Sequence, residues 1–212
     1  MRVSVALDPS RLCPQNGIAG VRGPESAGVW EGGMSGYLFL LVAVFSRILP
    51  HPLWNFTAVG ASLLYFGARR SPRQYFLPVL ALAATDYYLT TFVYSYPFHL
   101  RDYVVSWAWA LGACFLGSVL LRNSVTAGRI VGAALASSTS FFLLSNFAVW
   151  MGFGSYPHTL GGLTACYVAG LPFYRNDVLS TTLLTAAVFG LPLLAQRMVQ
   201  TLRDGGVDAM AG

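Results

Sequence analysis

The sequence has little charge, no lysine and no motif of a soluble enzyme. Only 10% of its 212 residues are charged, whereas a soluble globular domain carries about 25%. All 13 basic residues are arginines, spread singly or in small groups between apolar stretches, which is unlike the continuous basic surface of a nucleic-acid-binding protein. With 55% hydrophobic residues, the composition excludes a water-soluble domain and predicts an integral membrane protein that contacts lipid and binds no nucleic acid.

Cysteine and histidine are also scarce, and catalytic signatures are absent. The three cysteines, Cys13, Cys114 and Cys166, have no CxxC spacing, so we interpret them as small packing residues. The chain contains no HExxH, GxSxG or Walker loop, and its three histidines fall on separate connectors. We therefore expect no enzyme activity, no metal centre and no cofactor.

The composition changes near residue 33. Residues 1–33 are rich in glycine and proline and contain no long apolar run, so we expect a disordered tail there, with Met34 as an alternative start of the protein. Residues 34–197 are expected to form the transmembrane domain, and residues 198–212 a cytoplasmic C-terminal tail.

Apolar blocks predict an all-α fold: a polytopic membrane bundle of about six transmembrane helices. The block Thr159–Phe173 is interrupted by glycine and proline, and we predict a short re-entrant or interfacial helix there, with a seventh span as the alternative. The block Phe56–Ala68 has only 13 residues, about 20 Å of helix, so it crosses only if the preceding connector dips into the membrane. The six predicted spans are Gly33–Leu49, Phe56–Ala68, Tyr75–Tyr94, Tyr103–Leu121, Ile130–Met151 and Val178–Ala195.

The arginines indicate the orientation of these spans. Ten of the 13 fall on the side of the two termini, and only Arg47, Arg101 and Arg175 fall on the other. Because positively charged loops stay in the cytoplasm, both termini are predicted to be cytoplasmic, in a multi-pass protein of the inner (plasma) membrane.

Three connectors on the predicted outer side share an unusual composition. The segments 49–55, 94–102 and 152–159 each combine proline, an aromatic residue and one histidine. We interpret them as a lid over a site that opens outward. An interfacial belt of aromatic residues is the alternative.

A few polar residues fall inside the predicted spans. Asp86 is the one acidic residue well inside a span, where a charge must be paired or face water. We expect it either to line a pocket or to form a structural ion pair with Arg47. Asn146 and Trp150 recur on one face of the fifth span and are expected to present polar groups toward the outer side.

Small residues recur every four positions on two spans. This pattern is typical of helices that pack closely in a membrane. The predicted packing residues are Gly132, Ala136 and Ser140 on the fifth span, and Ala108 and Gly112 on the fourth.

The run Arg47–Ala61, Asp86, and the segments 141–150 and 156–163 together resemble a family of small bacterial integral membrane proteins described as a domain of unknown function. Its hallmark is R-x-L-P-H-P-x-x-N-F-T, and the resemblance covers about residues 46–191. More distantly, the layout is similar to the S components of energy-coupling-factor (ECF) vitamin transporters. That resemblance implies a pocket open to the outside, a small-molecule ligand, and partners comprising a coupling transmembrane subunit and ATPases.

These observations lead to one main hypothesis. We expect an S-component-like protein that binds a small solute, vitamin-like or otherwise, from the outer face and takes it up. A non-transporting scaffold or accessory subunit of a larger membrane complex is the alternative. The expected ligand-binding residues are Trp54, Asn55, Asp86, Asn146, Trp150, Tyr156 and His158.

Overall fold

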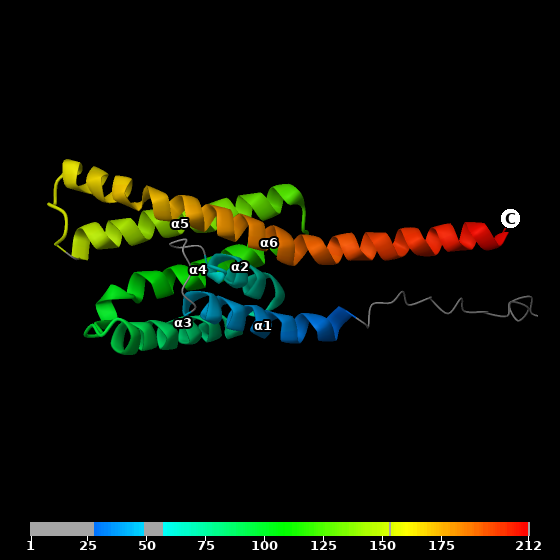
Figure 1. The fold of residues 1–212 in the computed structure, drawn as a ribbon, viewed down its shortest axis with the longest axis horizontal. Helices are drawn as coiled ribbons and strands as arrows, with labels where there is room; N and C mark the ends of the chain where they lie inside the picture. Colours follow the sequence, from blue (N-terminus) through cyan, green and yellow to red (C-terminus); the bar gives the residue numbers. More distant parts are fainter. Residues whose placement is uncertain (1–27, 49–56, 153, 212) are drawn as a thin grey trace, which may run out of the picture.

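The computed structural model describes residues 28–48, 57–152 and 154–211, and within these ranges the only regular secondary structure is helical. The α-helices pack side by side as an elongated bundle (Figure 1). Short 3₁₀ turns at Pro72–Gln74 and Leu100–Asp102 precede two of them. The helices are α1 (Gly28–Ile48), α2 (Val59–Arg69), α3 (Phe76–Tyr88), α4 (Val104–Leu121), α5 (Ala127–Gly152) and α6 (Leu160–Ala211).

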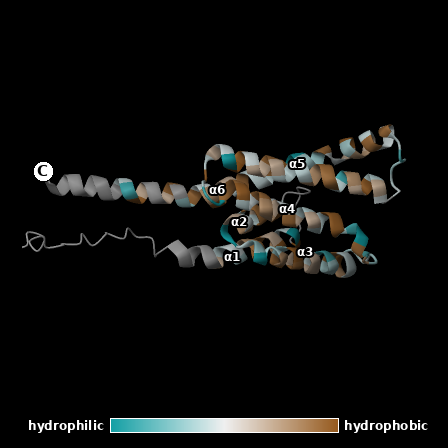
Figure 2. Cartoon of the chain, turned by 180° about the vertical axis from the view of Figure 1, so that it is seen from behind, coloured by the Kyte–Doolittle hydropathy of each residue, from teal (hydrophilic) through white to brown (hydrophobic). Residues whose placement is uncertain are grey.

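The all-α prediction is therefore confirmed, and three helical segments have the length and apolar character of membrane spans. In the part of the chain that the structure describes, these are Pro72–Val93, Val104–Leu121 and Ala127–Gly152, and the shorter stretch Met34–Ile48 is apolar as well. Large apolar side chains on their outer faces, such as Phe115 and Leu80, are exposed. Figure 2 shows this apolar character along the bundle, which is compatible with a membrane protein.

The centre of the bundle is the short helix α2. Every residue from Gly60 to Ala68 is buried, and α2 packs against α1, α4, α5 and α6. Its approach to α4 depends on two glycines: a Cβ on Gly67 would lie 1.8 Å from the carbonyl oxygen of Cys114, and one on Gly117 would lie 2.1 Å from that of Leu64. Small residues here allow backbone to meet backbone, as is common between membrane helices.

The predicted re-entrant helix at Thr159–Phe173 is not a separate element. Apart from Thr159, these residues form the first turns of α6, which continues without a break through Pro172 and Pro192 to Ala211. The glycines that favoured a break are instead points of close approach: a Cβ on Gly170 would lie 2.6 Å from the side-chain oxygen of Asn146, and one on Gly162 would lie 2.0 Å from the carbonyl oxygen of Pro157. Packing on α5 and its loop thus outweighs the low helix propensity of glycine.

The two ends of the described chain are more helical than expected. Helix α1 begins at Gly28, so residues 28–33, predicted as part of the disordered tail, are helical; residues 1–27 lie outside the described residues. The predicted C-terminal tail from residue 198 is part of α6 up to Ala211. At 52 residues, α6 is about 78 Å long, and its last turns project beyond the other helices (Figure 1).

The connectors gather at two opposite ends. The segments 94–103 and 154–159 lie at one end, and the arginine-bearing segments 70–75 and 122–126 lie at the other, from which α6 also projects (Figure 1). The end that carries 94–103 and 154–159 is called the loop end below.

Candidate functional site

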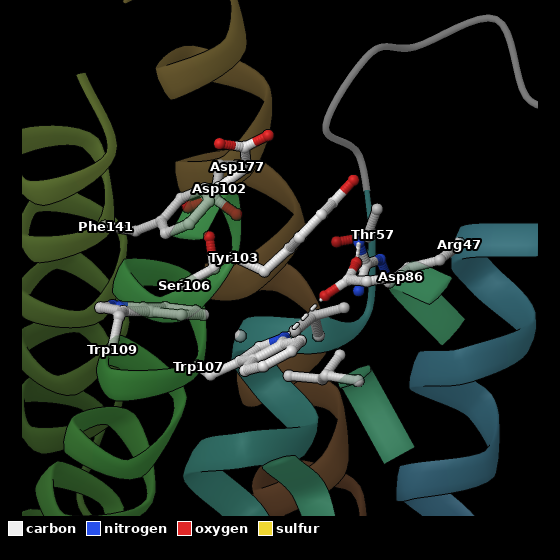
Figure 3. A pocket seen from close by; sticks show the side chains of 13 residues that line it. Arg47, Thr57, Asp86, Asp102, Tyr103, Ser106, Trp107, Trp109, Phe141 and Asp177 are labelled. Carbon is white, nitrogen blue, oxygen red and sulfur yellow. Dashed lines mark hydrogen bonds and ion pairs between the residues drawn. The ribbon is translucent and has the colours of Figure 1, made fainter. Parts of the chain in front are cut away.

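A cavity of about 220 Å³ lies between the helices toward the loop end, and we call it the main cavity. It is bounded by the last turn of α1, the start of α2, the second half of α3, the start of α4, and single residues of α5 and α6 (Figure 3). Its lining combines aromatic rings with charged and hydroxyl groups. The lining residues are Arg47, Thr57, Val59, Gly60, Leu82, Asp86, Asp102, Tyr103, Ser106, Trp107, Trp109, Phe141 and Asp177.

Asp86 lies at the wall of the main cavity and has both carboxylate oxygens engaged. Arg47 donates from Nη2 to Oδ1 and forms an ion pair with it, while the indole Nε1 of Trp107 donates to Oδ2 at 2.8 Å. The Asp86 side chain is only 4% exposed and that of Arg47 is 27% exposed. One buried carboxylate therefore joins α1, α3 and α4 (Figure 3), as expected for a charge held away from water.

A stack of aromatic rings forms the side of the main cavity next to α4. The ring of Tyr103 stacks on Phe98 at 5.0 Å and lies 6.1 Å from that of Trp107, nearly parallel to it. Trp109 packs against Phe141 at 4.6 Å. The Nε1 of Trp109 is bonded to the carbonyl oxygen of Ser137 and the hydroxyl of Ser140, both at 3.2 Å. The rings are thus held in place by hydrogen bonds and offer flat surfaces to a ligand.

The end of α3 is irregular where it approaches this stack. Residues Leu89–Val93 form a π-helical turn, and Ser95, with φ of 57°, lies in the left-handed region. Within the turn Thr90 is buried and its hydroxyl is hydrogen-bonded to that of Tyr103. π-Helical turns often occur at functional sites, and this one fixes the ring of Tyr103.

Asp177 connects the main cavity to a second cavity of about 170 Å³ between α5 and α6. Asp177 and Phe141 line both cavities. The Asp177 residue is only 8% exposed. Ser138 lines the second cavity with it, and the hydroxyls of Ser138 and Thr181 are buried with no hydrogen-bond partner among the described residues. No arginine side chain that the structure describes forms an ion pair with it.

The predicted ligand-binding residues fall into separate places. Asp86 lines the main cavity, whereas Asn146 lines the second cavity. The amide of Asn146 donates to the carbonyl oxygen of Phe142 at 2.8 Å and packs against Gly170. Asn146 is therefore positioned by the contact between α5 and α6.

Trp150 and His158 are brought together at the loop end. The indole Nε1 of Trp150 donates to the carbonyl oxygen of Pro157 at 3.0 Å, and the ring of His158 lies 3.0 Å from the carbonyl oxygen of Trp150. Tyr156 is half-buried in the same loop. None of these three lines either cavity, and the predicted residues Trp54 and Asn55 lie outside the described residues.

Four of the five predicted packing residues line an open groove between α4 and α5. A Cβ on Gly112 or Gly132 would meet nothing within 4 Å, and Ala108 and Ala136 are exposed. An apolar groove of about 640 Å³ runs between α4 and α5 and includes Ala108, Gly112, Ala136 and Ser140. The buried small residues of these helices are the neighbouring ones: Ala110, Ala113 and Gly117 on α4, and Ala133, Ala134, Ser137 and Ser138 on α5.

Several cavity residues were missed by sequence reasoning. Asp177 falls just before the predicted span Val178–Ala195, and Trp107 falls inside the predicted span Tyr103–Leu121. For Trp107 a signal is present: a tryptophan in a helical bundle needs an acceptor for its N–H, and Asp86 is the one carboxylate predicted well inside a span. Asp177 gave no comparable signal, because its burial depends on α6 being continuous.

The three carboxylates of the main cavity do not form a metal site as they stand. In the described ranges no three His, Cys, Asp or Glu side chains come together closely enough to hold a metal ion. Asp86 and Asp177 lie on different sides of the main cavity (Figure 3).

A family model matches residues 33–202 of the chain, and its description is a family of unknown function (DUF6580). The matched range includes every residue that lines the main cavity. No curated protein and no solved structure matches the chain.

Proposed function

Because the chain belongs to DUF6580, a family of unknown function, we propose its function from the main cavity: the protein binds a small solute from the outer face of the membrane and serves its uptake. The observation that carries this proposal is a cavity toward the loop end with fixed aromatic rings and a few oriented polar groups. Ligand sites in helical bundles have this composition.

The orientation and the partners belong to the same proposal. With the loop end outside, the main cavity is reached from the side of 94–103 and 154–159, and the arginine-bearing connectors lie in the cytoplasm. On the layout of an S component, a coupling transmembrane subunit and ATPases would supply the energy for uptake. Trp150, Tyr156 and His158 would then belong to the entrance rather than to the cavity wall.

The test is ligand-induced stabilisation of the purified full chain by a panel of vitamins, amines and nucleobases. A ligand that binds the folded state raises the melting temperature with its concentration. Ser106→Trp places a large ring at a residue that lines the main cavity and should abolish this stabilisation. Ser118→Trp, about three turns further along α4 and outside the cavity lining, is the matched control and should retain it.

The result that would overturn the proposal is equally clear. If no compound stabilises the protein, or if both tryptophan variants lose stabilisation to the same degree, the main cavity is not the binding site.

A second candidate function rests on the groove between α4 and α5. Its residues Ala108, Gly112 and Ala136 are exposed, and a Cβ on Gly112 would meet nothing within 4 Å. Such surfaces accept a neighbouring transmembrane helix. A scaffold would hold a partner subunit there. If a partner binds in the groove, Gly112→Leu should release the co-purifying partner without changing ligand-induced stabilisation. If no partner binds there, Gly112→Leu should change neither co-purification nor ligand-induced stabilisation.

A further inference from the structure

We propose that the solute carries a positive charge next to an aromatic or flat apolar group, and that Asp177 is the residue that binds the charge. This inference rests on the proposed function and specifies the chemical class of its ligand. It assigns to Asp177 a role that its position in a polar run of the sequence did not indicate.

The described lining of the main cavity holds more acidic than basic side chains. Among the described residues, three carboxylates, those of Asp86, Asp102 and Asp177, line it together with one cation, Arg47. Arg47 is engaged by Asp86. The remaining charge of the lining is negative, which attracts cations and repels anions.

Asp86 is not available to bind a ligand's charge. Its two oxygens are occupied by Arg47 and by the indole of Trp107. Breaking this pair would leave Arg47 without its buried partner, which is costly. Asp86 therefore holds the wall of the main cavity.

Asp102 is a weaker candidate because it is solvated. Its side chain is 25% exposed and lies 3.4 Å from that of Arg101, itself 82% exposed. An exposed carboxylate with a cation nearby gains little from a second cation.

Asp177 differs from both in being buried without a cationic partner. It is only 8% exposed and forms no ion pair with any described arginine. The hydroxyls of Ser138 and Thr181 are buried and form no hydrogen bond among the described residues, and neither supplies a positive charge. A buried ionisable residue that lacks such a partner points to a functional role, and an ammonium or similar group of a ligand would supply the charge.

The aromatic groups near Asp177 define the rest of the ligand. Phe141 lines both cavities together with Asp177, and Trp109 packs against Phe141. Aromatic faces attract cations and stack on flat groups. A cation carried by an aromatic or flat apolar body would therefore contact Asp177 and these rings together.

The test compares three probes that share an indole ring and differ in charge: tryptamine, tryptophol and indole-3-propionate. Each is titrated against the purified full chain, with binding followed by the melting temperature and by isothermal calorimetry. Tryptamine should bind at least about tenfold more tightly than tryptophol, because an ionic hydrogen bond to a buried carboxylate is worth about that factor. Indole-3-propionate should not bind.

Two variants test which carboxylate produces the preference for tryptamine over tryptophol. Asp177→Asn keeps the shape and the hydrogen-bonding groups and should reduce the ratio of tryptamine to tryptophol affinity to about one. Asp102→Asn makes the same change of charge at the solvated carboxylate and should leave the ratio within about twofold of the wild type. Without ligand, the Asp177→Asn protein should be at least as stable as the wild type, because the substitution removes the cost of burying a carboxylate that has no cationic partner.

The outcomes separate this inference from the proposed function. If tryptophol or indole-3-propionate binds as tightly as tryptamine, or if Asp177→Asn keeps the preference for the cation, the inference is overturned while solute binding stands. A fall in melting temperature of the Asp177→Asn protein with an unchanged affinity ratio also overturns it, since Asp177 is then only structural. If no compound of any charge binds, the proposed function fails and this inference fails with it.

Discussion

The guanidinium group of Arg47, in the last turn of α1, is paired with the carboxylate of Asp86 in the last turn of α3. The second oxygen of Asp86 accepts the indole N–H of Trp107 on α4. Three helices, α1, α3 and α4, thus meet at one carboxylate in the wall of the main cavity. Both roles that the sequence left open for Asp86 are met here, because it lines the main cavity and forms the ion pair with Arg47.

Removing one charge of the pair Arg47 and Asp86 should lower the free energy of unfolding more than removing both charges. Arg47→Met leaves the buried carboxylate uncompensated and should lower the free energy of unfolding by about 3 kcal/mol. Arg47→Met with Asp86→Leu removes both charges and should cost less than the sum of the single changes. Thermal unfolding of the four proteins in detergent gives the coupling energy of the double-mutant cycle. Additive losses would show that the two side chains do not interact.

The indole of Trp107 should contribute through its N–H as well as its ring. Trp107→Phe keeps an aromatic ring and removes the donor to a charged acceptor, so the expected loss of stability is about 1.5–3 kcal/mol. Trp109→Phe is the matched control, because its N–H donates to the neutral oxygens of Ser137 and Ser140 and should cost about 1 kcal/mol. Thermal unfolding in detergent measures both losses of stability. Equal losses would contradict a hydrogen bond from Trp107 to a charged acceptor.

Those features that depend on long apolar runs could be predicted from the sequence. The predicted spans Tyr75–Tyr94, Tyr103–Leu121 and Ile130–Met151 lie within a few residues of Pro72–Val93, α4 and α5, because hydropathy over about 20 residues defines such helices. The pairing of Asp86 with Arg47 was also among the expected roles, because a charge among apolar residues needs a partner.

The features that the sequence did not reveal depend on tertiary contacts. Glycines at positions 162 and 170 favoured a break, yet each lies against a group of α5 or its loop, so α6 is continuous and carries Asp177 into the bundle. The small residues Gly112 and Gly132 matched a packing pattern, but the periodicity of a helix does not say which of several small-residue faces meets a neighbour. Here Gly117 and Ala133 are buried instead.

The contact between α2 and α4 should tolerate no added methyl group. Gly67→Ala places a Cβ 1.8 Å from the carbonyl oxygen of Cys114, and Gly117→Ala places one 2.1 Å from that of Leu64. Because backbone must shift in both cases, each change should destabilise the protein by more than about 3 kcal/mol. Gly112→Ala, also on α4, meets open space and should be neutral or stabilising by up to about 1 kcal/mol. The yield of monodisperse protein and its melting temperature distinguish these outcomes, and tolerance of Gly67→Ala would contradict the close approach.

The proposed orientation predicts which loops a membrane-impermeant maleimide reaches in intact cells. Ser155, at the loop end, and Ser124, at the opposite end, are both exposed, so a cysteine at either position can react. In a background with Cys13→Ser, where Cys114 and Cys166 are buried, Ser155→Cys should be labelled in intact cells, and Ser124→Cys only after the membrane is opened. This follows because arginine-bearing connectors stay in the cytoplasm. The reverse pattern would place the entrance to the main cavity on the cytoplasmic side, and capture of a solute from outside would then be excluded.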